Sequence, residues 1–126
     1  MLHLFFNIKP EPKLRPRFSK YGAYTPVKTK IFEDDLKVLA RRQLPPGFEL
    51  YTKPIEVKMV FHFVRPKTVP KLRIYPTTKP DIDNLSKALA DALNGLVWKD
   101  DSIIYSLTAI KLYAPKPGIL LYVFDN

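Results

Sequence analysis

Residues 79–101 read KPDIDNLSKALADALNGLVWKDD and hold five aspartates, at positions 81, 83, 91, 100 and 101. The chain as a whole is strongly basic, because 21 lysines and arginines outnumber 12 acids and give a net charge of +9. Like charges gathered in one stretch repel each other, and hard divalent cations bound by carboxylate oxygens commonly neutralise them. An acidic cluster within a basic protein indicates a metal-dependent enzyme that acts on nucleic acid.

The middle of this stretch predicts a helix over residues 83–93. Its apolar residues are spaced for one buried stripe, formed by Leu85, Leu89, Ala92 and Leu93. Asn94-Gly95 is a favourable pair for ending a helix, and Asp83 is well placed to cap its start. Pro80 keeps the segment before the helix extended. The stretch therefore predicts an extended segment, a helix and a turn.

This local structure predicts how the acids meet. In extended backbone, residues two apart point to the same side, so Asp81 and Asp83 can both face one ion. Lys87 lies one helical turn beyond Asp83, which places its ammonium group beside the carboxylates. Asp100 and Asp101 can join them only if the connection after the helix folds back toward it.

Each of these residues also has an ordinary interpretation. Asp83 can be only a helix cap, Lys87 only a solvated ion-pair partner, and Asp100-Asp101 only a turn. Asp91 is expected to be an exposed helix residue and not a ligand. All the ordinary interpretations must hold at once to remove the site, so the joint pattern favours a catalytic cluster.

Working outward, the sequence predicts an α+β fold as a single domain over residues 1–126. The sheet, of about four strands and mixed or antiparallel, packs against two main helices. The first helix reaches about residue 42 from a cap at Thr25-Pro26, with Val27, Ile31, Phe32, Leu36, Leu39 and Ala40 as its buried stripe. The other elements are strands at 2–8, 55–64, 102–113 and 118–124, a proline-rich arm at 9–17, a turn or small hairpin around Gly22, and a basic loop at 65–80.

Composition excludes several classes of function. The absence of cysteine rules out disulfides, thiolate metal sites and cysteine nucleophiles, and two distant histidines do not indicate a zinc site. The sequence has no apolar run long enough to cross a bilayer and no signal-peptide pattern, so we expect a soluble, cytoplasmic protein without an organic cofactor. A basic surface that serves only solubility is the plain alternative to a polyanionic partner. An anionic membrane is a weaker candidate partner than nucleic acid, because no basic amphipathic helix is present.

The arm and the basic loop supply the cations expected to contact phosphates. These are Lys13, Arg15, Arg17, Lys20, Arg65, Lys67, Lys71, Arg73 and Lys79. Phe18, Tyr21 and Tyr24 lie among the arm's cations, where they either stack on unpaired bases or fill structural positions.

Two longer patterns resemble the RusA family of Holliday-junction resolvases. One runs from Lys79-Pro80-Asp81-Ile82-Asp83-Asn84-Leu85 through Lys87 and Asp91-Ala92-Leu93-Asn94-Gly95 to Trp98, Asp100-Asp101 and Ile103. The other is Pro12-Lys13-x-Arg15-Pro16-Arg17-Phe18, followed by Tyr24-Thr25-Pro26. Some members carry a basic residue directly before the first aspartate, where this chain has Pro80 and places Lys79 one position earlier.

The resemblance implies a small homodimeric endonuclease that cuts four-way or other branched DNA with Mg²⁺ or Mn²⁺, in a bacterial or prophage setting. It assigns metal binding to Asp81, Asp83 and Asp101, with Asp100 as the second candidate in its pair, and it makes Lys87 necessary for cleavage. Lys87 would stabilise developing negative charge or orient the attacking water.

Two rival functions remain. One is a non-catalytic basic module that binds nucleic acid, in which the aspartates are caps and turns. The other is a nucleotide hydrolase or phosphotransferase, which commonly needs a glycine-rich loop that four scattered glycines do not form.

Overall fold

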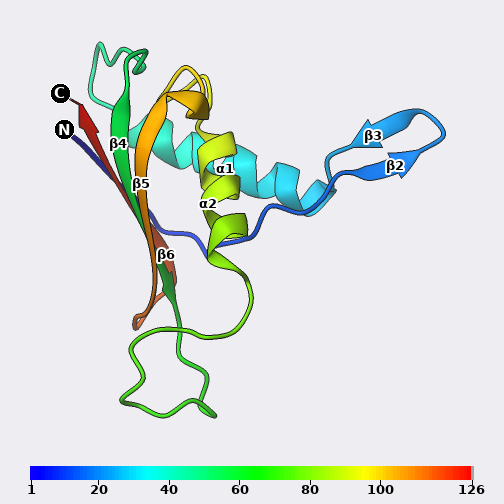
Figure 1. Ribbon diagram of the computed structural model, residues 1–126, viewed down its shortest axis with the longest axis vertical. Coiled ribbons are helices and arrows are strands. Elements are labelled where there is room, and N and C mark those ends of the chain that lie inside the picture. The colour runs from blue at the N-terminus through cyan, green and yellow to red at the C-terminus, as the bar shows by residue number, and fades with distance from the viewer. Residues whose placement is uncertain (126) are drawn as a thin grey trace.

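The computed structural model describes residues 1–125 and contains two α-helices, α1 and α2, six strands and one short 3₁₀ turn (Figure 1). In chain order these are β1 (Leu2–Phe6), β2 (Arg17–Ser19), β3 (Gly22–Tyr24), α1 (Val27–Gln43), β4 (Ile55–Phe63), α2 (Ile82–Ala92), the 3₁₀ turn Asp101–Ile103, β5 (Ile104–Tyr113) and β6 (Gly118–Asp125). Neither helix within residues 1–125 has the length and apolar composition needed to span a bilayer.

Four strands form the main sheet in the order β1-β6-β4-β5. β4 and β5 run parallel, while β1–β6 and β4–β6 are antiparallel. Parallel neighbours need a long crossover, and here α2 lies within the crossover between β4 and β5. The prediction of an α+β fold, with a mixed or antiparallel sheet of about four strands and two main helices, is confirmed, and the sheet is mixed.

The hydrophobic core lies between the sheet and the two helices, which cover the same face of it (Figure 1). Alternate residues of the central strands point into this core and are fully buried, namely Val57, Met59, Phe61, Ile119, Leu121 and Val123. The helices contribute Leu36, Leu85 and Leu89, each at most 1% exposed. The helices and the sheet therefore form the two packed layers of the fold.

The predicted buried stripe of α1 is wrong at its first turn. Val27 and Ile31 are 72% and 55% exposed, whereas Phe32, Leu36 and Ala40 are buried as expected. The beginning of α1 extends past the sheet toward the β2–β3 hairpin, so its first apolar residues have no layer to pack against (Figure 1). The predicted cap is also wrong, since Pro26 occupies the N-cap position and no side chain caps the helix.

The β2–β3 hairpin projects away from the body of the protein (Figure 1). Gly22 allows its tight turn with a φ of 111°, a conformation that other residues rarely adopt. Phe18 and Tyr21 are 82% and 88% exposed on it. The predicted small hairpin is confirmed, and its aromatic side chains are not structural filler.

Candidate active site

The first turn of α2 carries the first two aspartates. Asp81 occupies the N-cap position with extended backbone, but its side chain makes no capping hydrogen bond. Asp83 lies inside the helix, where its Oδ1 accepts a hydrogen bond from the backbone N–H of Asn84 at 2.9 Å. The predictions that Asp83 caps the helix and that both carboxylates share an extended segment are wrong, because the helix begins one residue early, at Ile82.

The loop before Asp81 is fixed from β5. The Nζ of Lys111 donates hydrogen bonds to the carbonyl oxygens of Thr78 and Pro80, at 2.7 and 2.9 Å. Lys79, joined to Pro80 by a cis peptide bond, brings its Nζ to 3.9 Å from the Oδ2 of Asp81. Lys111 thus anchors the approach to the first aspartate, a role that no local motif signals.

The connection after α2 folds back against the last turns of the helix, and not against its start. Gly95 turns the chain with a φ of 79°, and its N–H donates to the carbonyl of Trp98 at 2.7 Å. Trp98 is fully buried, and its Nε1 donates to the carbonyl of Ala90 and to the Oδ1 of Asn94. The tryptophan therefore holds the residues before Asp101 against the end of α2.

The two aspartates of the second pair have different surroundings. Asp100 is exposed and caps the 3₁₀ turn, with its Oδ2 accepting from the backbone N–H of Ser102 at 3.1 Å. The hydrogen bonds from Ser102 lower the pKa of Asp100. Asp101 is partly buried, and its pKa is raised by that burial, by a hydrogen bond with the Asp91 side chain and by nearby carboxylates.

Three of the predicted residues line one surface hollow. Asp83 and Lys87 reach it from α2, and Asp101 reaches it from the 3₁₀ turn; its volume is about 490 Å³. Asp81 lines a neighbouring hollow together with Asp83. The fold therefore brings Asp83, Lys87 and Asp101 to one concave surface, and places Asp81 next to it.

The acids are not arranged as a finished metal centre. Within residues 1–125, no three aspartate, glutamate or histidine side chains lie close enough together to hold a metal ion. The reason is the length of α2. Asp81 lies at the start of this helix, whereas Asp101 lies beside Asp91 near its end. The ten residues from Asp81 to Asp91 span about 15 Å along the helix axis, which separates these carboxylates. The donor chemistry does suit Mg²⁺, since Asp81 and Asp83 are exposed carboxylates.

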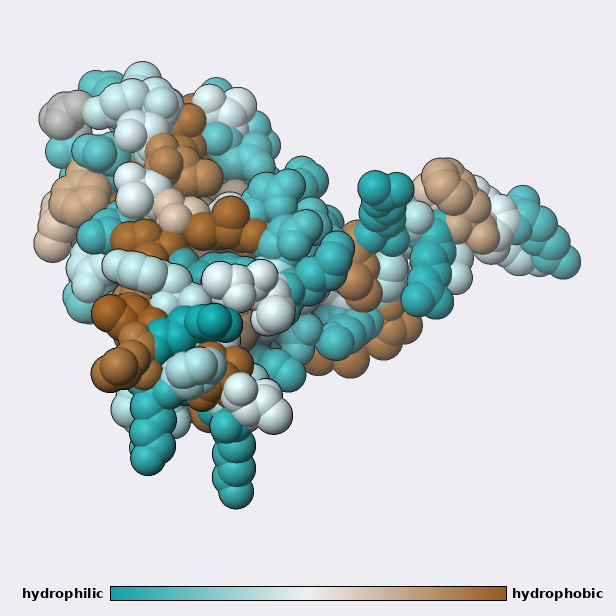
Figure 2. Space-filling model, turned by 60° about the horizontal axis from the view of Figure 1, so that its bottom comes forward, coloured by the Kyte–Doolittle hydropathy of each residue, from teal (hydrophilic) through white to brown (hydrophobic). Residues whose placement is uncertain are grey.

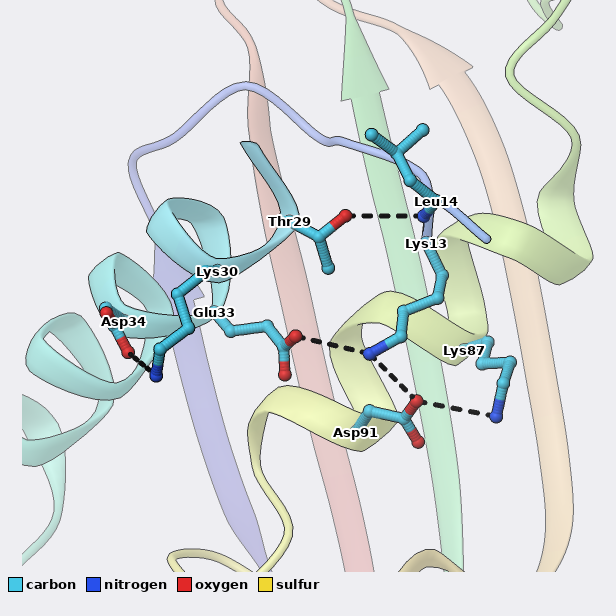
Figure 3. A network of polar contacts seen from close by, with 8 residues as sticks. All are labelled: Lys13, Leu14, Thr29, Lys30, Glu33, Asp34, Lys87 and Asp91. Atoms are coloured by element: carbon cyan, nitrogen blue, oxygen red, sulfur yellow. Dashed lines mark hydrogen bonds and ion pairs between the residues drawn. The ribbon is translucent and has the colours of Figure 1, made fainter. Parts of the chain in front are cut away.

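Asp91 belongs to this site, so its prediction as an exposed helix residue is wrong. Its side chain is 20% exposed, and its Oδ2 lies 3.4 Å from the Nζ atoms of both Lys87 and Lys13 (Figure 3). Lys13 also donates to the Oε1 of Glu33 on α1 at 3.2 Å. The spacing of Lys87 and Asp91, four residues apart, signals one ion pair, but the contacts of Lys13 and Glu33 are tertiary and leave no local pattern.

The predicted DNA contacts are mostly exposed. Hydrophilic side chains project from the hairpin at the right of Figure 2 and from the face turned toward the viewer. The exposed cations of the predicted set are Arg15, Arg17, Lys20, Lys67, Lys71, Arg73 and Lys79. Arg65 is partly buried and donates two hydrogen bonds to the carbonyl of Arg73, while Lys13 pairs with Glu33 and Asp91.

Comparison with known proteins gives two matches. The model of the family described as "Endodeoxyribonuclease RusA" matches residues 7–123. A protein named "Uncharacterized protein YqaN", from Bacillus subtilis (strain 168), is 32% identical over 130 residues, which cover 90% of this chain and 90% of that protein. The family match contains every residue of the candidate site.

Proposed function

Because this chain belongs to the RusA endodeoxyribonuclease family, we propose that it resolves four-way DNA junctions by hydrolysing phosphodiester bonds in paired strands. The observation that supports this most strongly is the hollow shared by Asp83, Lys87 and Asp101, which come from two separate segments of the chain. Carboxylates can hold a divalent cation that assists phosphodiester hydrolysis, and an ammonium group can stabilise the negative charge that develops.

Asp83 and Asp101, joined by Asp81, are the residues that would hold the cation, which would be Mg²⁺ or Mn²⁺. When bound, such an ion supplies a more acidic water and screens charge on the phosphoryl oxygens. Asp100 is the weaker candidate ligand, because its carboxylate caps the 3₁₀ turn through Ser102. The carboxylates fix where the phosphate sits relative to α2.

Lys87 provides a positive charge to the reacting phosphate. Its side chain is 62% exposed and lies in the same hollow as Asp83 and Asp101. An ammonium group held beside the scissile phosphate stabilises the negative charge that develops on the phosphoryl oxygens. The ion pair with Asp91 keeps that charge at the hollow while DNA is absent.

The hairpin and the loop over residues 64–80 would bind the DNA arms. Arg15, Arg17 and Lys20 lie on or beside the hairpin and are exposed. Their contacts with phosphates would give affinity that falls steeply with salt. Phe18 and Tyr21, extended into solvent on the hairpin, are available to stack on bases that a junction leaves unpaired.

A homodimer would present two such sites to the two equivalent strands of a junction. The sheet face opposite the helices offers a surface for it, because Phe5 is 46% exposed there and Leu120, Tyr122 and Phe124 are only partly buried. Aromatic side chains are enriched at the centre of subunit interfaces. Replacing Phe5 and Tyr122 with glutamate should yield monomers by gel filtration, and an unchanged dimer would exclude this face.

The proposal is tested with a labelled synthetic four-way junction, a duplex and a single strand, each incubated with Mg²⁺ or EDTA. Symmetrical paired nicks in the junction alone, and only with Mg²⁺, are expected. Binding with a steep salt dependence but no cleavage in any condition would instead indicate a non-catalytic nucleic-acid-binding module.

A further inference from the structure

The carboxylate of Asp91 forms ion pairs with two lysines from different parts of the chain. Its Oδ2 lies 3.4 Å from the Nζ of Lys87 on the same helix and 3.4 Å from the Nζ of Lys13 in the N-terminal arm (Figure 3). Lys87 faces the hollow with 62% of its side chain exposed, whereas Lys13 and Asp91 are only 21% and 20% exposed. Asp91 therefore joins an exposed cation at the site to a mostly covered cation behind it.

The arm is held at the same place by three further contacts. The backbone N–H of Lys13 donates to the carbonyl of Asn84 on α2 at 3.0 Å, and its Nζ donates to Glu33 on α1 at 3.2 Å. The backbone N–H of Leu14 donates to the Oγ1 of Thr29, a residue only 2% exposed, at 3.4 Å (Figure 3). Residues 13 and 14 are thus clamped between α1 and α2, three residues before the β2–β3 hairpin begins.

Asp91 also touches the third predicted aspartate. The Asp101 side chain is a near neighbour of the Asp91 carboxylate, and Lys87 lies within electrostatic reach of both carboxylates. The carboxylate of Asp91 is consequently the common neighbour of Lys87, Asp101 and Lys13. A residue with these contacts controls where the catalytic lysine and the hairpin stand relative to each other.

We propose that Asp91 is the positioning residue of this site: it holds Lys87 at the hollow and, through Lys13, fixes the arm that carries the DNA-binding hairpin. Lys13 then has a structural role in the site and does not contact phosphate, since Glu33 and Asp91 already neutralise its charge. This inference rests on the proposed junction cleavage for its kinetic consequences, but the clamp itself can be measured without cleavage.

The first experiment compares junction cleavage by Asp91→Asn with that by Asp34→Asn. Asp34 pairs with Lys30 on the exposed side of α1 at 3.5 Å and does not line the hollow, so it is a matched control. Loss of a residue that orients a reacting group typically costs about 10- to 100-fold in activity. We expect such a fall in kcat for Asp91→Asn with KM changed less than about 3-fold, Asp91→Glu recovering most of it, and no change for Asp34→Asn.

The second experiment asks what Lys13 does. The variants Lys13→Met and Arg15→Met each lose one positive charge from the same arm, and Arg15 is exposed. Loss of a phosphate contact lowers the slope of log Kd against log salt by about one. We expect Arg15→Met to lower the slope, and Lys13→Met to leave the slope unchanged while trypsin cuts the hairpin at Arg17 and Lys20 several-fold faster.

The outcomes separate this inference from the proposed function. If the wild-type protein leaves junctions intact, the proposed function fails. The salt dependence of DNA binding and the trypsin rates still show whether Lys13 fixes the arm between α1 and α2. Asp91→Asn with wild-type kcat at temperatures well below its melting point would overturn the positioning role and leave only a structural one. If the slope of log Kd against log salt falls equally in Lys13→Met and Arg15→Met, Lys13 contacts phosphate and its proposed structural role is wrong.

Discussion

The two ends of α2 carry the same residue type in opposite surroundings. At the start, Asp81 has a side chain that is 54% exposed and a single lysine at 3.9 Å, and Asp83 is exposed as well. Nine residues into the helix from Ile82, Asp91 is 20% exposed and its oxygen is shared by two lysines at 3.4 Å. Exposed carboxylates remain available to an ion and a substrate, whereas a carboxylate already paired is used to hold its partners.

The difference follows from what each end packs against. The start of α2 faces the loop over residues 64–80, which has no helix or strand of its own. The far end meets the arm, Glu33 of α1 and the turn anchored by the buried Trp98. One helix therefore combines an open end suited to chemistry with a closed end suited to positioning.

The largest expected effect is at the open end. Asp83→Asn removes a charge that the hollow shares with Lys87 and Asp101, while the side chain keeps its size. The cleavage rate should fall by about 10²- to 10³-fold, the usual cost of removing one preorganised group at the reacting centre. The affinity for junction DNA should be equal or tighter, as measured by gel shift in EDTA. Cleavage at the wild-type rate would remove Asp83 from the chemistry.

The closed end depends on Trp98. Trp98→Phe leaves the carbonyl of Ala90 and the Oδ1 of Asn94 without their donor. The free energy of unfolding should fall by about 2 kcal/mol, the usual cost of a lost buried hydrogen bond with an unpaired partner, as measured by urea denaturation. Cleavage should fall as well, because the turn that places Asp101 is loosened. Full stability in this variant would show that the indole N–H does not anchor the turn.

A smaller difference separates Asp91→Ala from Asp81→Ala. Asp91→Ala removes the ion-pair partner of Lys87 and one of the two acidic partners of the mostly covered Lys13, and should lower the free energy of unfolding by about 1 kcal/mol. Asp81→Ala should cost less than about 0.5 kcal/mol, since its side chain makes no capping hydrogen bond. Thermal melts in EDTA measure both. Equal losses would contradict the contrast between the two ends.

The pH dependence of stability gives the smallest effect. Burial, followed by the hydrogen bond with Asp91 and the nearby carboxylates, raises the pKa of Asp101 above its ordinary value of 3.8. A raised pKa in the folded state contributes stability that is fully present below the unfolded value and is lost as the pH rises through the folded one. In EDTA, the wild-type protein should therefore lose stability relative to Asp101→Asn as the pH rises from 3.8. A difference that does not vary with pH would contradict these surroundings of Asp101.

The sequence predicts the open end better than the closed end. The Asp81-x-Asp83 pattern, the position of Lys87 and the Asp100-Asp101 pair are local, and each is visible in a few neighbouring residues. The strands of the main sheet and the small hairpin also follow from local alternation and from Gly22, whereas the strand order and the parallel β4–β5 pair do not. The start of α2 is not predicted correctly from the local sequence. The position of the N-cap depends on backbone angles that Pro80 alone does not determine.

The closed end requires contacts between distant segments. Lys13 lies 78 residues before Asp91, and from the sequence its charge predicts a phosphate contact. The structure instead pairs it with Glu33 and Asp91. From the sequence, Lys111 is likewise indistinguishable from any other lysine on a strand. In the structure it donates hydrogen bonds to two carbonyls of the loop before Asp81. Partners of this kind are set by how the helices and strands pack, and no periodic pattern encodes them.

We propose that Asp83 and Asp101, with Asp81, hold one divalent cation beside Lys87. Anomalous diffraction from crystals of the wild-type protein soaked in Mn²⁺ locates that ion directly. We expect an anomalous peak within coordinating distance of the Asp83 and Asp101 carboxylates, and no such peak in Asp83→Asn. A peak that contacts neither residue, or one that persists unchanged in Asp83→Asn, would contradict it.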